Sequence, residues 1–146
     1  MRAKTMSEAL LMADSDPNFE ALHGWGYLRP RYDDGKFEGI QGCALGGIVT
    51  RLIPKKSIKE YADWAYNSED FDREGIIEKI CGKIKGSCDQ VPIKIWKKLL
   101  PGDKYLFHEW DVYPESTRWV DLVERLYENK NKTFKQIAKI LKRYDK

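Results

Sequence analysis

The stretch Gly42-Cys43-Ala44-Leu45-Gly46-Gly47-Ile48-Val49 decides the fold, because it sets a cysteine among small and aliphatic residues where an irregular segment gives way to a helix. The pattern is typical of a tightly packed core helix, which we expect to run from Cys43 to Ile53 and to end at Pro54. A thiol at a helix N-terminus also meets the positive end of the helix dipole, which favours the thiolate. The stretch therefore fits both a structural and a catalytic role.

Upstream of this stretch the sequence predicts a helix, a break and a hairpin. Residues 4–13 have apolar groups at helical spacing, and residues 18–22 are expected to add one more helical turn. Asp33-Asp34-Gly35 is typical of a hairpin turn between segments 27–32 and 36–40, although Pro30 weakens the first strand.

Downstream of this stretch, helix signals dominate. Thr133 followed by Gln136 forms a capping box, and Ser57 followed by Glu60 forms another. We therefore predict a mainly α fold, with residues 1–146 as a single compact domain of about six or seven helices and at most one small β-hairpin, near residues 27–40.

Composition favours an ordered domain of the cytoplasm. The chain has 146 residues, of which 42% are hydrophobic and five are tryptophan, enough bulky apolar groups to build a core. No apolar run has the length of a membrane span, and the first residues lack the apolar core of a signal peptide, so we expect no membrane partner. The three cysteines form an odd set, which favours free thiols over a disulfide framework.

A cysteine hydrolase would use Cys43 as nucleophile and His108 as base, with Asp111 or Glu109 orienting the imidazole. The order of these residues along the chain is that of papain-like enzymes. The residues around Cys43 do not match that family's cysteine signature, so no catalytic residue is favoured and an enzyme is the less favoured reading. We expect no metal, because Cys81 and Cys88 are too widely spaced for a zinc knuckle. We expect no cofactor either, since Gly42, Gly46 and Gly47 do not form a phosphate-binding glycine pattern.

Nucleic-acid binding is a second alternative, because residues 120–142 read as two helices joined by a short turn, as in a helix-turn-helix. Lys135, Lys139, Lys142 and Arg143 would then face phosphates. The apolar stripe of the last helix is equally explained by docking on the core, which leaves its lysines as an ordinary solvated face.

The preferred contact surface is the aromatic loop that contains Tyr105, Phe107, Trp110 and Tyr113. Tyrosine and tryptophan supply much of the binding energy at protein interfaces, although the same side chains could cap the core instead.

Two segments resemble a family of small bacterial and phage proteins of unknown function. Trp25, Asp34-Gly35 and Cys43-Ala44-Leu45-Gly46-Gly47 are similar to that family's tryptophan–glycine segment and Cys-Ala-Leu-Gly helix. Residues 126–129 and Thr133-Phe134-Lys135-Gln136-Ile137-Ala138 are similar to its C-terminal segment, but Glu128-Asn129 stands where the family has Asn-Asp. The resemblance covers about a third of the chain. It implies a helical fold and a phage or mobile-element origin, and it assigns no catalytic residue.

We therefore expect a small accessory or structural protein that acts through protein–protein contacts, with a protein partner or self-association. If the chain is phage-encoded, its location is the host cytoplasm or the virion.

Overall fold

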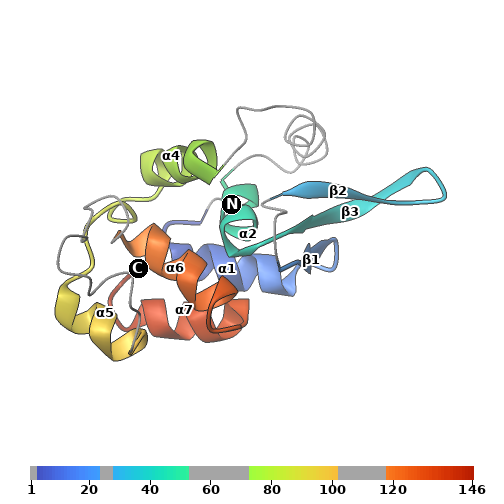
Figure 1. Cartoon of the computed structure of the whole chain (residues 1–146). Helices are drawn as coiled ribbons and strands as arrows, with labels where there is room; N and C mark the ends of the chain where they lie inside the picture. Colours follow the sequence, from blue (N-terminus) through green and yellow to red (C-terminus); the bar gives the residue numbers. More distant parts are fainter. Residues whose placement is uncertain (1–2, 24–27, 53–72, 102–117) are drawn as a thin grey trace.

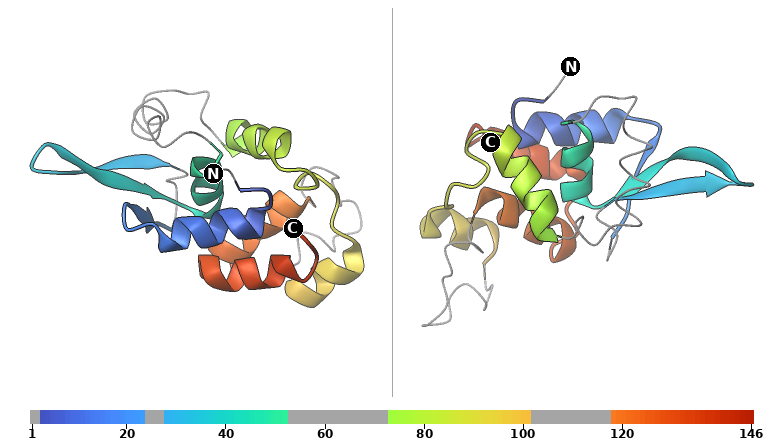
Figure 2. Two further views of the ribbon diagram at one scale, coloured as in Figure 1. Left: turned by 180° about the vertical axis from the view of Figure 1, so that it is seen from behind. Right: turned by 90° about the horizontal axis from the view of Figure 1, so that it is seen from above.

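The structure, a computed structural model, describes residues 3–23, 28–52, 73–101 and 118–146 (Figure 1). In these ranges the helices are α1 (Met6–Ser15), α2 (Ala44–Thr50), α4 (Arg73–Lys83), α5 (Ile93–Leu99), α6 (Trp119–Glu128) and α7 (Phe134–Lys142). The strands are β1 (Phe19–Ala21), β2 (Arg29–Asp33) and β3 (Lys36–Gly42). The helices form one body, and the sheet lies at one side of it (Figures 1 and 2).

Helix α2 occupies the centre of the body. All seven of its residues are buried, and it packs against α1, α4, α6 and strands β1 and β3. Its last residue, Thr50, donates a hydrogen bond from its hydroxyl to the Gly47 carbonyl, so this polar side chain is satisfied inside the core. The core helix therefore exists as the sequence predicts, but it is shorter than the expected range.

The sheet has the strand order β1-β3-β2, with β1 parallel and β2 antiparallel to β3. The β2–β3 turn lies where its sequence signal predicts it. Asp34 and Gly35 both have positive φ, 49° and 79°, which matches the twist that a two-residue hairpin turn requires. The hairpin projects from the helical body as a two-stranded ribbon (Figures 1 and 2).

The prediction of a mainly α fold is wrong. Among the described residues 51% are helical and 17% lie in strands, so the class is α+β, with six helices and a three-stranded mixed sheet. Strand β1 occupies the segment where the sequence predicts a further helical turn. Asp16 precedes a proline and is extended, at φ −84° and ψ 114°, so the chain leaves α1 in a β-like conformation. The Ile40 N–H then donates to the Asn18 carbonyl and draws the segment onto β3.

The C-terminal helix pair forms as the capping box predicts. The Gln136 N–H donates to the Thr133 hydroxyl at 3.1 Å, and the Thr133 N–H donates to the Gln136 side-chain oxygen at 2.9 Å. Helix α7 buries Phe134, Ile137, Ala138 and Leu141 and packs along α1. The other predicted capping box, at Ser57, lies outside the described residues.

Cys81 and Cys88 are joined by a disulfide, and Cys43 is the free cysteine. The expectation that the thiols stay free is therefore wrong for this pair. After α4 the chain turns at Gly86, where φ is 85°, and the Ser87 hydroxyl donates to the Ile84 carbonyl at 2.7 Å. This turn brings the two cysteine Cα atoms to 5.4 Å, a normal separation for a disulfide. Closing a loop this short contributes about 2–3 kcal/mol to stability.

The same turn holds the C-terminal residue. Lys146 donates from its ammonium group to the Gly86 carbonyl at 3.3 Å and forms an ion pair with Asp89 at 3.5 Å. Its backbone carbonyl accepts from the Met6 N–H at 2.6 Å, so the end of the chain closes onto the start of α1.

Gly39→Ala should lower the free energy of unfolding by about 2–4 kcal/mol. Gly39 has a φ of 148°, and a methyl group there would overlap the carbonyl of Asn18, where β1 joins β3. The measurement is urea unfolding followed by circular dichroism. Gly82→Ala is the matched control, because Gly82 lies in α4 with no atom within 4 Å of an added Cβ. The control should be unchanged or up to about 1 kcal/mol more stable. Equal stabilities of the two variants would contradict this account of the β1–β3 junction.

Candidate functional site

Cys43 is the N-cap of α2, but its sulfur is enclosed. The residue is 2% exposed, and burial raises the pKa of its thiol to about 12. The backbone N–H groups of Leu45 and Gly46 act in the opposite direction, as expected at a helix N-terminus, but their effect is smaller. Glu124 and Glu128 raise the pKa further. Cys43 is therefore a protonated thiol at neutral pH.

Tyr127 of α6 lies close enough to Cys43 for a thiolate there to raise the tyrosine pKa as well, although burial is the main cause of that rise. The Tyr127 hydroxyl is buried and has no hydrogen-bond partner in the described part of the chain. The imidazole of His23 stacks on the Tyr127 ring with centroids 4.1 Å apart, and its Nδ1 lies 4.0 Å from the Glu128 carboxylate. The side chain of His23 is 52% exposed. No sequence motif marks this histidine as a functional residue.

This cluster lacks the geometry of a nucleophilic cysteine. An activated cysteine has a lowered pKa and a base within hydrogen-bond reach. Cys43 has a raised pKa, and within the described part of the chain no imidazole is hydrogen-bonded to its sulfur. The proposed partners His108 and Asp111 lie outside the described residues. Of the residues that the hydrolase hypothesis names, the structure therefore describes Cys43. The two other sulfurs, which a zinc site would use, are bonded to each other.

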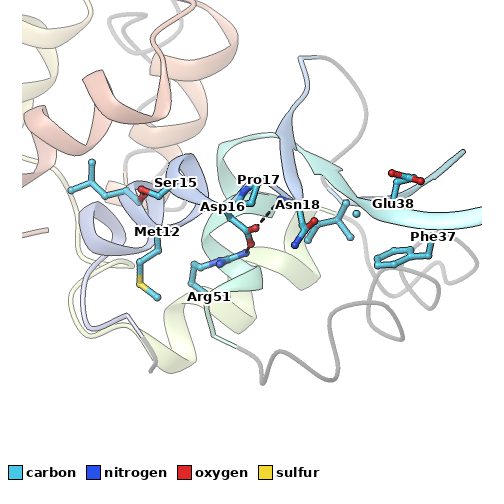
Figure 3. A pocket seen from close by; sticks show the side chains of 11 residues that line it. Met12, Ser15, Asp16, Pro17, Asn18, Phe37, Glu38 and Arg51 are labelled. Carbon is cyan, nitrogen blue, oxygen red and sulfur yellow. Dashed lines mark hydrogen bonds and ion pairs between the residues drawn. The ribbon is translucent and has the colours of Figure 1, made fainter.

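A surface groove, which we call the α1–β3 groove, lies between the C-terminal end of α1 and strand β3 (Figure 3). It has a volume of about 840 Å³. Its apolar lining comes from Leu11, Met12, Pro17, Phe37 and Ile40. These residues come from two separate segments of the chain, and no sequence motif marks them.

Four polar residues of the α1–β3 groove already have hydrogen-bond partners within the protein: Ser15, Asp16, Asn18 and Arg51. The Arg51 guanidinium donates to the Asp16 carboxylate at 2.8 Å and, through Nε, to the Thr50 hydroxyl at 3.0 Å (Figure 3). The Asn18 N–H donates to the other oxygen of Asp16 at 2.8 Å, and Ser15 donates to the Leu11 carbonyl at 2.9 Å. A site that orients a small ligand needs polar groups aimed into it. Since these groups are already hydrogen-bonded within the protein, the groove is better suited to apolar contact over a wide surface.

The projecting hairpin extends this apolar surface. Tyr32 of β2 is 49% exposed and packs edge-on against Phe37 of β3, with centroids 6.0 Å apart. Leu11 of α1 is 39% exposed at the other side of the α1–β3 groove. These exposed aromatic and aliphatic side chains resemble the apolar patches that proteins use as contact sites.

The face of α7 that points away from α1 is basic. Lys135, Lys139, Lys142 and Arg143 are all exposed, and none forms an ion pair with another described residue. The structure thus brings together all four residues of the nucleic-acid alternative on one solvent-facing surface. The four aromatic residues of the expected contact surface, Tyr105, Phe107, Trp110 and Tyr113, lie outside the described residues.

None of the described helices combines the length and apolar character needed to cross a lipid bilayer. In comparisons with family models, curated proteins and solved structures, nothing matched this chain. The resemblance to small bacterial and phage proteins therefore stays a prediction.

The native protein should show no fast-reacting thiol with Ellman's reagent at pH 8. A pKa of about 12 leaves roughly one Cys43 in ten thousand ionised at that pH, and the reagent cannot reach the buried sulfur. In denaturant without reductant one thiol per chain should react, because Cys81 and Cys88 are paired. Cys43→Ala is the control and should show none in either state. A rapid, stoichiometric native reaction that Cys43→Ala removes would support the hydrolase hypothesis instead.

Proposed function

We propose that the protein is a small binding protein that acts through protein–protein contacts, with the α1–β3 groove and the β2–β3 hairpin as its contact surface. The observation that carries the proposal is an apolar groove beside a projecting ribbon, with Leu11 exposed in the groove and Tyr32 exposed beside Phe37, which lines it. Such a role agrees with the accessory or structural function expected from the sequence, although the contact surface differs from the aromatic loop favoured there.

The chemistry of the described residues supports a binding role over catalysis. The free cysteine is buried with a raised pKa, and the ion pair in the α1–β3 groove is satisfied within the protein. The free edge of the hairpin is poorly suited to pairing with a partner strand, because β2 contains Pro30 and mostly charged residues. Contact through side chains in the groove is therefore favoured over the addition of a strand to the sheet.

Replacing Leu11 by lysine should weaken partner binding at least tenfold, because a charge would enter an apolar contact. The assay places a photoreactive benzophenone amino acid at Ser15, which is exposed and lines the α1–β3 groove, and measures protein adducts in cells of the source organism. Excess unlabelled protein should compete for the adduct, and Leu11→Lys should need at least ten times the concentration.

Lys83→Glu is the matched control competitor, because Lys83 is exposed on α4 and belongs to neither candidate binding surface. It should compete as well as the wild type. If Ser15 gives no discrete adduct, or if both variants compete equally, the α1–β3 groove is not the contact surface.

Nucleic-acid binding is the second candidate, supported by the exposed basic face of α7. The α6–turn–α7 pair has the order of a helix-turn-helix, with the basic residues on its second helix. The apolar residues of α7 are buried, and the helix packs on α1. The basic face is therefore the side of α7 that a partner can reach.

If α7 binds DNA, affinity for a random-sequence duplex should fall steeply between 50 and 200 mM salt, as counterion release requires. Lys139→Glu should weaken binding and reduce the salt slope by about one. Lys36→Glu, at the hairpin, changes the net charge equally and serves as the control. Fluorescence anisotropy of a labelled duplex measures both quantities. No binding at 50 mM salt would remove this candidate.

A further inference from the structure

Three large hydrophobic residues stand out as exposed in the described part of the chain: Leu11 at 39%, Tyr32 at 49% and Ile93 at 52%. Leu11 and Tyr32 belong to the contact surface already described. Ile93 is the first residue of α5, which lies at the side of the molecule opposite the hairpin in every view (Figures 1 and 2). The exposed apolar groups are thus divided between two opposite ends.

The helices that carry these groups have opposite charge. Helix α1 contains Glu8 and Asp14 and no basic residue, and Asp16 follows it. Helix α5 contains three lysines and no acidic residue. Lys94 and Lys98 are exposed on the same helix as Ile93, and they form no ion pair with any described residue. Glu38 on β3, at the α1–β3 groove, is also exposed without an ion-pair partner there.

We propose that the occupant of the α1–β3 groove is helix α5 of a second copy of this chain, bound head to tail. Ile93 contacts the apolar lining around Leu11, and Lys94 and Lys98 meet the acidic end of α1 and Glu38 on β3. The inference rests on the proposed function and names its partner. The alternative is a partner protein of different sequence that binds the same groove, and the experiment below distinguishes the two.

A head-to-tail contact leaves a free groove on one copy and a free α5 on the other. Association therefore continues into a ring or an open chain of copies, whereas an isologous contact would stop at a dimer. This difference makes the proposal testable with the purified protein alone.

The wild-type mass, measured by sedimentation velocity and light scattering at 50 mM salt, should rise with concentration beyond two chains of 17.1 kDa. At 500 mM salt the average mass should fall, because exposed ion pairs are screened. Lys83→Glu, on α4, should behave as the wild type, because Lys83 is exposed and lies on neither side of the proposed contact.

Two variants separate the two sides of the contact. Ile93→Asp disables α5 and keeps an intact groove, while Leu11→Lys disables the groove and keeps an intact α5. Each should be monomeric alone, and an equimolar mixture should form a 1:1 dimer that grows no further. Should either variant fail to fold, Lys94→Glu and Asp14→Lys reverse one charge on each side and test the same contact.

Self-association is wrong if the wild type stays monomeric at all concentrations, if Ile93→Asp associates as the wild type does, or if the mixed variants stay monomeric. The adduct at Ser15 decides the proposed function separately. An adduct with a protein of different sequence, together with a monomeric wild type, would leave the groove as a contact surface and overturn only the choice of partner.

Discussion

The described fold depends on the complete burial of α2 against helices on several sides. Gly47 is the closest point of this packing, because a Cβ atom there would lie 2.9 Å from the Phe134 ring of α7 and 3.4 Å from the Ala13 side chain of α1. Phe134 in turn packs with its ring tilted against Phe19 of β1 and Tyr127 of α6, with centroids 5.7 and 5.4 Å apart. Because Gly47 has no side chain, the Phe134 ring of α7 can contact α2, α6 and strand β1 at the same time.

The same burial decides the chemistry of Cys43. A helix N-terminus favours a thiolate, but that favourable field acts here on a sulfur with almost no access to water. The loss of hydration destabilises the thiolate more than the N–H groups of Leu45 and Gly46 stabilise it. The carboxylates of Glu124 and Glu128 on α6 destabilise it further by repulsion. An N-cap cysteine at a protein surface would have a lowered pKa. At the N-cap of the buried helix α2, the same residue keeps its proton.

Local signals in the sequence predicted those elements that local interactions determine. The small-residue helix, the Asp34-Gly35 turn and the Thr133 capping box all depend on residues within a few positions of one another. Strand β1 does not depend on local residues. Its three residues form a strand by pairing with Ile40, Gln41 and Gly42 of β3, which lie about twenty positions further along the chain. The Cys81–Cys88 bond likewise depends on how the chain turns at Gly86, which a count of cysteines does not report. The α1–β3 groove combines residues 11–18, 37–40 and 51, so no window of sequence contains it.

The groove also follows from how α2 ends. Arg51, the residue after α2, donates to Asp16, the residue after α1, so the ion pair joins the C-terminal ends of the two helices. Because both partners are largely buried and Thr50 takes another guanidinium N–H, the pair joins the two helices without presenting a net charge to the groove. The acidic character of this end of the molecule then comes from exposed residues such as Asp14 and Glu38, which ligands can reach without breaking the fold. A partner that carries an aliphatic residue beside lysines, as α5 does, matches both the lining and the rim of this groove.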